Sequence, residues 1–103
     1  MAYQLLYFDE VLTDVQEAKA WHKEKRDGLE DEFALAVETA LERILKMPTG
    51  YSIRYKNIRI IHTKVFPYNV HYFVNEAEKK IAITAIVHNK RNLDVVRNRI
   101  SQY

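Results

Sequence analysis

Apolar residues recur at helical spacing in the first half of the chain. Leu29 begins the clearer stripe, which consists of Leu29, Phe33, Ala36, Val37, Ala40, Leu41, Ile44 and Leu45. Pro48 and Gly50 end this helix. A weaker stripe of Val15, Ala18 and Trp21 or His22 predicts an earlier helix that runs to about Lys25. Thr13–Gln16 has the spacing of a capping box, and Gly28 suits a left-handed helix end, so we expect an antiparallel helix hairpin.

The second half changes to the composition of strands. Ile58–Lys64, Phe66–Asn75 and Lys80–His88 are rich in β-branched and aromatic residues, as is Tyr3–Phe8 before the hairpin. A short terminal helix is predicted over residues 93–100. We therefore predict a single α+β domain over residues 1–103, with an N-terminal strand, an antiparallel helix hairpin packed on a mainly antiparallel four-stranded sheet, and a short C-terminal helix. Its core is expected to include Val15, Trp21, Phe33, Val37, Leu41, Leu45, Val70, Tyr72 and Ile83.

Composition narrows the class of protein. With 103 residues, 48% hydrophobic and 29% charged, the chain fits one globular domain rather than a disordered segment. It has no cysteine, which excludes disulfides and thiolate-bound metals. No apolar run approaches the roughly 18 residues of a membrane span. The N-terminus does not have the pattern of a signal peptide. We expect a cytoplasmic protein that needs no cofactor or metal.

Charge is distributed unevenly along the chain. Residues 1–50 have a net charge of −5 and residues 51–103 a net charge of +7, within a total of +2. The basic half favours an acidic partner, either nucleic acid or an acidic protein segment. A solvated basic face without a partner is the alternative.

Four short motifs follow one another along the chain. They are Trp21–Leu29 followed by Phe33, then Pro48 after the second helix, then Arg59 with Phe66–Tyr72, and finally Ile83–Val87 followed by His88–Asn92. In this order they resemble the RelE/ParE superfamily, with its helix–Gly-Leu–helix junction, its Phe-Pro-Tyr turn and a strand end with a His and an Arg three residues later. The resemblance covers essentially the whole chain.

The resemblance implies the toxin of a type II toxin–antitoxin, or plasmid stabilisation, system. A cognate antitoxin would hold such a toxin inactive in a toxin–antitoxin hetero-oligomer. RelE-like members cut mRNA on the ribosome, using basic residues and often a tyrosine near the C-terminus. ParE-like members lack that catalytic set and poison DNA gyrase. A decayed toxin that only binds its antitoxin is a third interpretation.

An mRNA endonuclease would need a general base, a general acid and cations around the phosphate. The candidates are Arg59, His62, Lys64, His71, His88 and Arg91. Alternation places His62 with Ile60 and His71 with Asn69, and the sequence leaves open whether the two faces coincide. Each of these histidines also has a structural interpretation. His22, on the first helix, is expected to be structural.

The C-terminal segment favours the ParE interpretation. No tyrosine lies between Leu93 and Gln102, and Tyr103 comes too late for a precise catalytic role. The His88-to-Arg91 ending is similar to ParE. We therefore predict a gyrase-binding toxin without catalysis of its own, which contacts its target or antitoxin through Lys90, Arg91, Arg97 and Arg99. An ordinary charged terminal helix is the alternative, and a RelE-like endonuclease is the second functional hypothesis.

Overall fold

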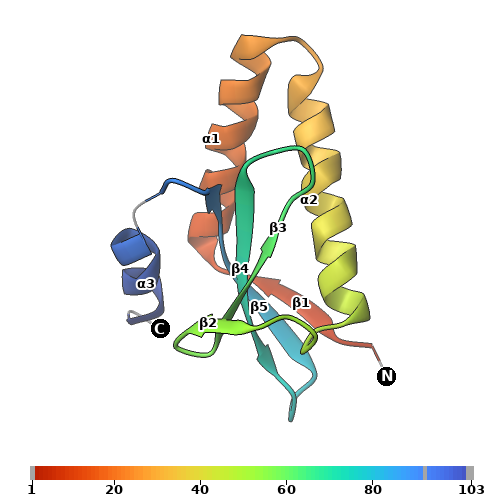
Figure 1. Ribbon diagram of the computed structural model, residues 1–103, viewed down its shortest axis with the longest axis vertical. Coiled ribbons are helices and arrows are strands. Elements are labelled where there is room, and N and C mark those ends of the chain that lie inside the picture. Colours follow the sequence, from red (N-terminus) through yellow and green to blue (C-terminus); the bar gives the residue numbers. More distant parts are fainter. Residues whose placement is uncertain (1, 92, 102–103) are drawn as a thin grey trace.

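The computed structural model describes residues 2–91 and 93–101. Its elements, in chain order (Figure 1), are β1 (Gln4–Tyr7), α1 (Asp9–Lys25), α2 (Leu29–Lys46), β2 (Ile53–Tyr55), β3 (Ile58–His62), β4 (Tyr68–Asn75), β5 (Lys80–His88) and α3 (Leu93–Ser101). The predicted α+β fold, helix hairpin and terminal helix are confirmed. Gly28 has the predicted left-handed conformation, with φ of 91°, between α1 and α2.

The sheet has five strands rather than the predicted four, in the order β1-β5-β4-β3-β2. β1 is parallel to β5, and the other three pairs are antiparallel. The additional strand, β2, has only three residues and turns into β3 through Lys56 and Asn57, which both have positive φ. A strand this short carries too little alternation to be predicted from sequence.

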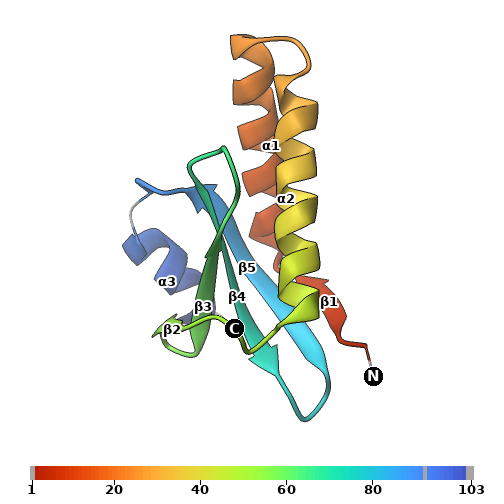
Figure 2. The same ribbon diagram turned by 45° about the vertical axis from the view of Figure 1, so that its right-hand side comes forward.

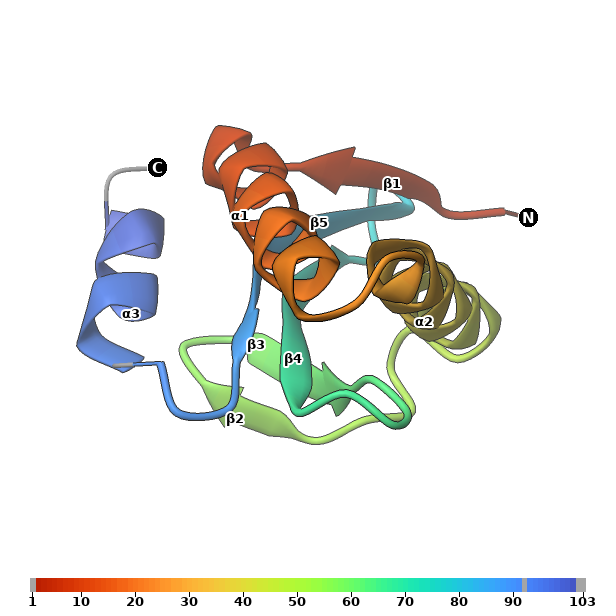
Figure 3. The same ribbon diagram turned by 90° about the horizontal axis from the view of Figure 1, so that it is seen from above.

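The helix hairpin covers one face of the sheet and α3 lies on the other (Figure 2). The hairpin face carries Val70 opposite Ile86 and Tyr72 opposite Ile83, and these four residues belong to the main core with Phe33. On the opposite face, Val96 of α3 packs on Ala85 and Val87. Seen from above, α3 lies on the side of α1 rather than of α2 (Figure 3). This placement lets α3 reach α1 around the edge of β5.

Most of the predicted core is confirmed. Phe33, Val37, Val70, Tyr72 and Ile83 are buried, and Val15 and Leu41 pack against them. Two predictions were wrong, because Trp21 is 54% exposed and Leu45 is 39% exposed.

The helix phase explains both errors. α1 begins at Asp9, and its inward stripe is Val11, Asp14, Ala18 and His22. His22 therefore takes the inward position that the sequence pattern left open between it and Trp21. In α2 the inward position belongs to Ile44, which is fully buried, instead of Leu45. The predicted capping box was also wrong, since Thr13 lies inside α1 and Phe8 occupies the N-cap.

Candidate functional site

The register of β3 and β4 places His62 and His71 on one face of the sheet. His62 lies opposite Asn69, and His71 lies opposite Ile60. Directly opposed residues of antiparallel strands point to the same side, so the two faces that the sequence left unrelated coincide. This is the face on which α3 packs. His62 is exposed, and its Nδ1 contacts Oδ1 of Asn69.

His71 is completely buried beneath α3. Its Nδ1 lies 2.8 Å from the Tyr55 hydroxyl, and its Nε2 has no hydrogen-bond partner among the described residues. Burial, the largest cause, and the nearby Arg99 guanidinium together lower the pKa of His71 to about 4, although the Asp14 carboxylate acts in the opposite direction. The imidazole is therefore neutral near pH 7 and is shielded from any substrate.

This buried histidine makes stability depend on pH. The unfolded chain protonates His71 below its ordinary pKa of 6.5, whereas the folded protein does so only below about 4. The contribution of His71 to the free energy of unfolding should therefore be fully present above pH 6.5. It should fall as pH decreases towards 4, by roughly 3 kcal/mol in total. Urea unfolding across this range should show the fall in the parent and in His62→Gln. It should be absent from His71→Gln, and an equal slope in all three proteins would contradict this role.

Arg59 and His88 lie on the hairpin face instead. Arg59 is opposite Tyr72, and its guanidinium donates to the carbonyl oxygens of Thr49, at 3.2 Å, and Tyr51. These bonds tie the segment after α2 to the sheet. His88 is opposite Tyr68, is exposed, and accepts a hydrogen bond at Nδ1 from the backbone N–H of Lys90 at 3.0 Å. The nuclease candidates are thus divided between two faces.

Arg99 forms a buried ion pair with Asp14 of α1. Its Nη1 and Nη2 lie 2.7 and 2.8 Å from the two carboxylate oxygens, and Nη1 also donates to the Thr84 carbonyl at 3.1 Å. Asp14 accepts a further bond from the Ile86 N–H at 3.1 Å. β1 pairs with β5 only over Lys80–Ile83. Beyond that point, Arg99 and Asp14 provide hydrogen-bond partners for the Thr84 carbonyl and the Ile86 N–H of β5 in place of a neighbouring strand.

The burial of Arg99 corrects the expectation that it contributes to a binding surface, since only 8% of the residue is exposed. Sequence reasoning missed Asp14 entirely. Its signal was available, because a carboxylate on the inward stripe of a helix requires a buried partner. Arg97, by contrast, is exposed, with its guanidinium carbon 5.2 Å from the centre of the Tyr55 ring.

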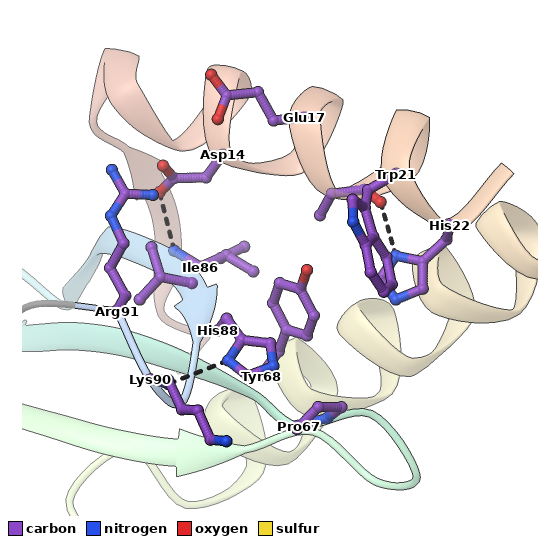
Figure 4. Close-up of a pocket in the computed structure, with 12 residues that line it drawn as sticks. Asp14, Glu17, Trp21, His22, Pro67, Tyr68, Ile86, His88, Lys90 and Arg91 are labelled. Carbon is purple, nitrogen blue, oxygen red and sulfur yellow. Dashed lines mark hydrogen bonds between the residues drawn. The ribbon is translucent and has the colours of Figure 1, made fainter. Parts of the chain in front are cut away.

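Lys90 and Arg91 line a groove of about 620 Å³ between α1 and the ends of β4 and β5. We call it the α1–β5 groove, and its exposed or half-exposed lining includes Glu17, Trp21, Tyr68, His88, Lys90 and Arg91. Figure 4 shows Trp21 coming down from α1 and Tyr68 rising from β4 towards the same space, with Arg91 at the opposite end from Trp21. Lys64 is exposed in the β3–β4 connection and does not line the groove.

Two further observations concern the part of the chain that the structure describes. It contains no group of three His, Asp or Glu residues arranged to hold a metal ion. None of its helices is both long enough and apolar enough to cross a membrane. Tyr103, for which no catalytic role was predicted, lies outside the described residues.

Comparison with solved structures identifies the fold. A chain of the chromosomal ParDE toxin–antitoxin system from P. aeruginosa superposes with a TM-score of 0.72 at 11% sequence identity, covering 84% of this chain and 95% of its own. A mutant of the E. coli toxin RelE in the free state superposes with a TM-score of 0.67 at 14% identity, covering 99% of this chain and 97% of its own. No protein-family model and no curated protein matches the sequence. The fold is that of RelE/ParE-like toxins.

Proposed function

We propose that this protein is the toxin of a type II toxin–antitoxin system and that it acts as a ParE-like poison of DNA gyrase. A cognate antitoxin would be its inhibitory partner. The fold it shares with structures of a ParDE system and of RelE supports the system. The charge of the C-terminal half and the exposed Lys90, Arg91 and Arg97 supply a surface for an acidic partner.

The division of the histidines between two faces is the observation that favours gyrase binding over catalysis. Cleavage of RNA needs a base and an acid on either side of one phosphate. His62 lies on the α3 face and His88 on the hairpin face, and a sheet separates them. His71 shares a face with His62 but is fully buried. Neither His71 nor His88 can therefore serve with His62 as the acid–base pair of one cleavage.

One observation favours the second candidate, a metal-independent RelE-like mRNA endonuclease acting with the ribosome. The α3 face carries the exposed His62 together with Tyr55, and the Arg97 guanidinium lies over the Tyr55 ring. An exposed imidazole on the same face of the sheet as a cation is a chemically reasonable proton acceptor beside a phosphate. In this alternative, His62 would need a general acid other than a histidine.

Growth of cells that express the protein tests whether it is the toxin of a toxin–antitoxin system. Induced expression of the chain alone should slow growth, and co-expression of the neighbouring reading frame should restore it. The protein must be shown to be folded, for example by circular dichroism of the purified chain. Growth that is unaffected by soluble, folded protein would contradict an active toxin and would support the decayed form that only binds an antitoxin.

A further inference from the structure

Val65, in the connection between β3 and β4, has a backbone conformation that its residue type disfavours. Its φ is 73°, in the left-handed region that glycine and asparagine adopt readily and that a β-branched residue adopts only at a cost. The other described residues with positive φ are Gly28, Lys56, Asn57 and Lys79, and none of them is β-branched. The sequence thus has, at Val65, a residue that opposes the shape of its own turn.

The surrounding residues impose this shape. Thr63 N–H donates to the Tyr68 carbonyl at 3.0 Å, and Tyr68 N–H donates to the Phe66 carbonyl at 2.8 Å. The Thr63 hydroxyl donates to the same Phe66 carbonyl at 2.8 Å. The centroid of the Phe66 ring lies 5.4 Å from that of Phe33, which is fully buried. The connection is therefore anchored on both sides of Val65, and the unfavourable conformation persists because its neighbours determine it.

The Val65 side chain does not contribute to the folded core, because the residue is 97% exposed. A single exposed apolar residue is ordinary, and glycine or asparagine would form this turn without strain. Val65 is apolar, strained and exposed at once, and neither packing nor turn formation accounts for that combination. Since strained backbone conformations cluster at binding sites, we look for its role outside the fold.

Val65 is close to the basic turn that follows β5. The backbone N–H of Asn89 donates to the Pro67 carbonyl at 2.9 Å, which joins this turn to the β3–β4 connection. Lys90 and Arg91 follow Asn89 and are exposed, and neither takes part in an ion pair within the described part of the chain. This end of the sheet therefore presents an apolar side chain together with two exposed cations.

The charges near the connection favour a protein as the partner. α2 begins with Glu30, Asp31 and Glu32, within one turn of Phe33, on which the connection packs. A nucleic acid backbone along this end of the molecule would meet those carboxylates. The side chains that proteins insert between DNA bases are larger or more rigid than valine, namely Phe, Leu, Ile, Met and Pro. A small branched side chain is better suited to an apolar recess in a folded protein.

We infer that Val65 is a contact residue through which the protein binds its target, with its two methyl groups in an apolar recess of a target protein and with Lys90 and Arg91 on acidic side chains at the rim of that recess. The identification of the target as DNA gyrase rests on the proposed function, whereas the contact role of Val65 rests on its conformation, its exposure and its neighbours. A side chain on an anchored backbone loses little conformational freedom on binding.

Replacement of Val65 separates its contribution to binding from its contribution to folding. Val65→Asn suits the left-handed conformation and removes the apolar branch. It should raise the midpoint of thermal unfolding by several degrees and weaken the inhibition of gyrase supercoiling at least about tenfold. Val65→Thr keeps the β-branch and the strain but replaces a methyl group by a hydroxyl. It should leave the unfolding midpoint unchanged and still weaken the inhibition.

Lys79→Asn is the matched control, because Lys79 also has a positive φ, of 57°, in the turn between β4 and β5. This turn lies at the opposite end of β4 from the β3–β4 connection. The change should leave the inhibition of gyrase equal to that of the parent, whatever its effect on the unfolding midpoint.

A unique thiol reports the contact directly. The chain has no cysteine, so Val65→Cys introduces the only one. Saturating gyrase should slow the alkylation of this thiol by a maleimide at least about tenfold, because contacts of this kind are desolvated. Plasmid DNA alone and single-stranded RNA alone should not slow it. The thiol of Lys79→Cys should react at the same rate with and without gyrase.

The outcomes distinguish this inference from the proposed function. Inhibition by Val65→Asn that equals that of the parent would refute the inference alone. A lower unfolding midpoint in Val65→Asn would also refute it, because the side chain would then support the fold, as would protection of the thiol by nucleic acid alone. If the parent slows growth without inhibiting gyrase, the proposed function fails. Loss of growth inhibition in Val65→Asn would then still support the contact role, and its retention would refute both. A parent without either effect would also refute both.

Discussion

Asp14→Ala is expected to lower the free energy of unfolding by about 3–5 kcal/mol, because it leaves the Arg99 guanidinium buried without its counterion. The side chains of Asp14 and Arg99 are 4% and 10% exposed, so water does not replace the lost carboxylate. The same change removes the acceptor of the Ile86 N–H at the β5 edge. Urea unfolding monitored by circular dichroism would measure the loss.

Two controls separate the ion pair from its surroundings. Asp14→Asn keeps an acceptor oxygen and should cost less than Asp14→Ala. Glu17→Ala, one turn further along α1 and exposed, should change stability by less than about 0.5 kcal/mol. In Asp14→Ala, hydrogen exchange should accelerate in α3 more than in α2, since Arg99 joins α3 to α1. A loss below about 1 kcal/mol with unchanged exchange in α3 would show that the pair does not hold this helix.

The second large effect concerns toxicity. Simultaneous charge reversal of Lys90, Arg91 and Arg97 to Glu should abolish growth inhibition, whereas His62→Gln and His88→Gln should leave it intact. A gyrase-binding surface concentrates its energy in a few contacts, among which arginine is common. Binding to gyrase requires no proton transfer, so loss of a titratable histidine should not affect it. If the protein were a nuclease, removing its general base or acid would lower activity by about 10²–10⁴-fold.

A matched control keeps the change in net charge the same. Reversal of Lys23, Lys46 and Lys79 to Glu alters three exposed cations elsewhere on the chain and should preserve toxicity. Loss of toxicity in folded His62→Gln, in a parent that cuts mRNA, would replace the gyrase interpretation by the RelE-like one. His71→Gln is less informative for this purpose, because the residue is buried and its replacement also affects stability.

Periodicity was sufficient to predict most of the fold. The α2 stripe runs along the whole helix because one side of the helix packs inward, and β5 is apolar along most of its length because both of its faces are covered. Pairing between β1 and β5 was not predictable, because a parallel pair joins segments at opposite ends of the chain without a local turn signal. The pairing of Asp14 with Arg99 was not predictable for the same reason, because the two residues are 85 positions apart in the chain.

The candidate site was predicted less well than the fold. The sequence pointed to Lys90 and Arg91, since cations after the last strand are visible as charges. It placed Trp21 in the core, because an aromatic residue on a helix usually packs inward. Only the phase of α1, which turns His22 inward, shows that Trp21 faces the groove. The separation of His62 from His88 likewise depends on strand register, which alternation alone does not determine.

The central claim is tested most directly by adding the purified protein to DNA gyrase and relaxed plasmid and, separately, to ribosomes translating a defined mRNA. The account predicts that supercoiling is inhibited in proportion to the protein added, that the Lys90, Arg91 and Arg97 reversal removes the inhibition, and that the mRNA stays intact. Salt should weaken the inhibition, because exposed charges are screened over about 8–10 Å at physiological ionic strength. Cleavage of the mRNA with supercoiling unaffected would contradict it.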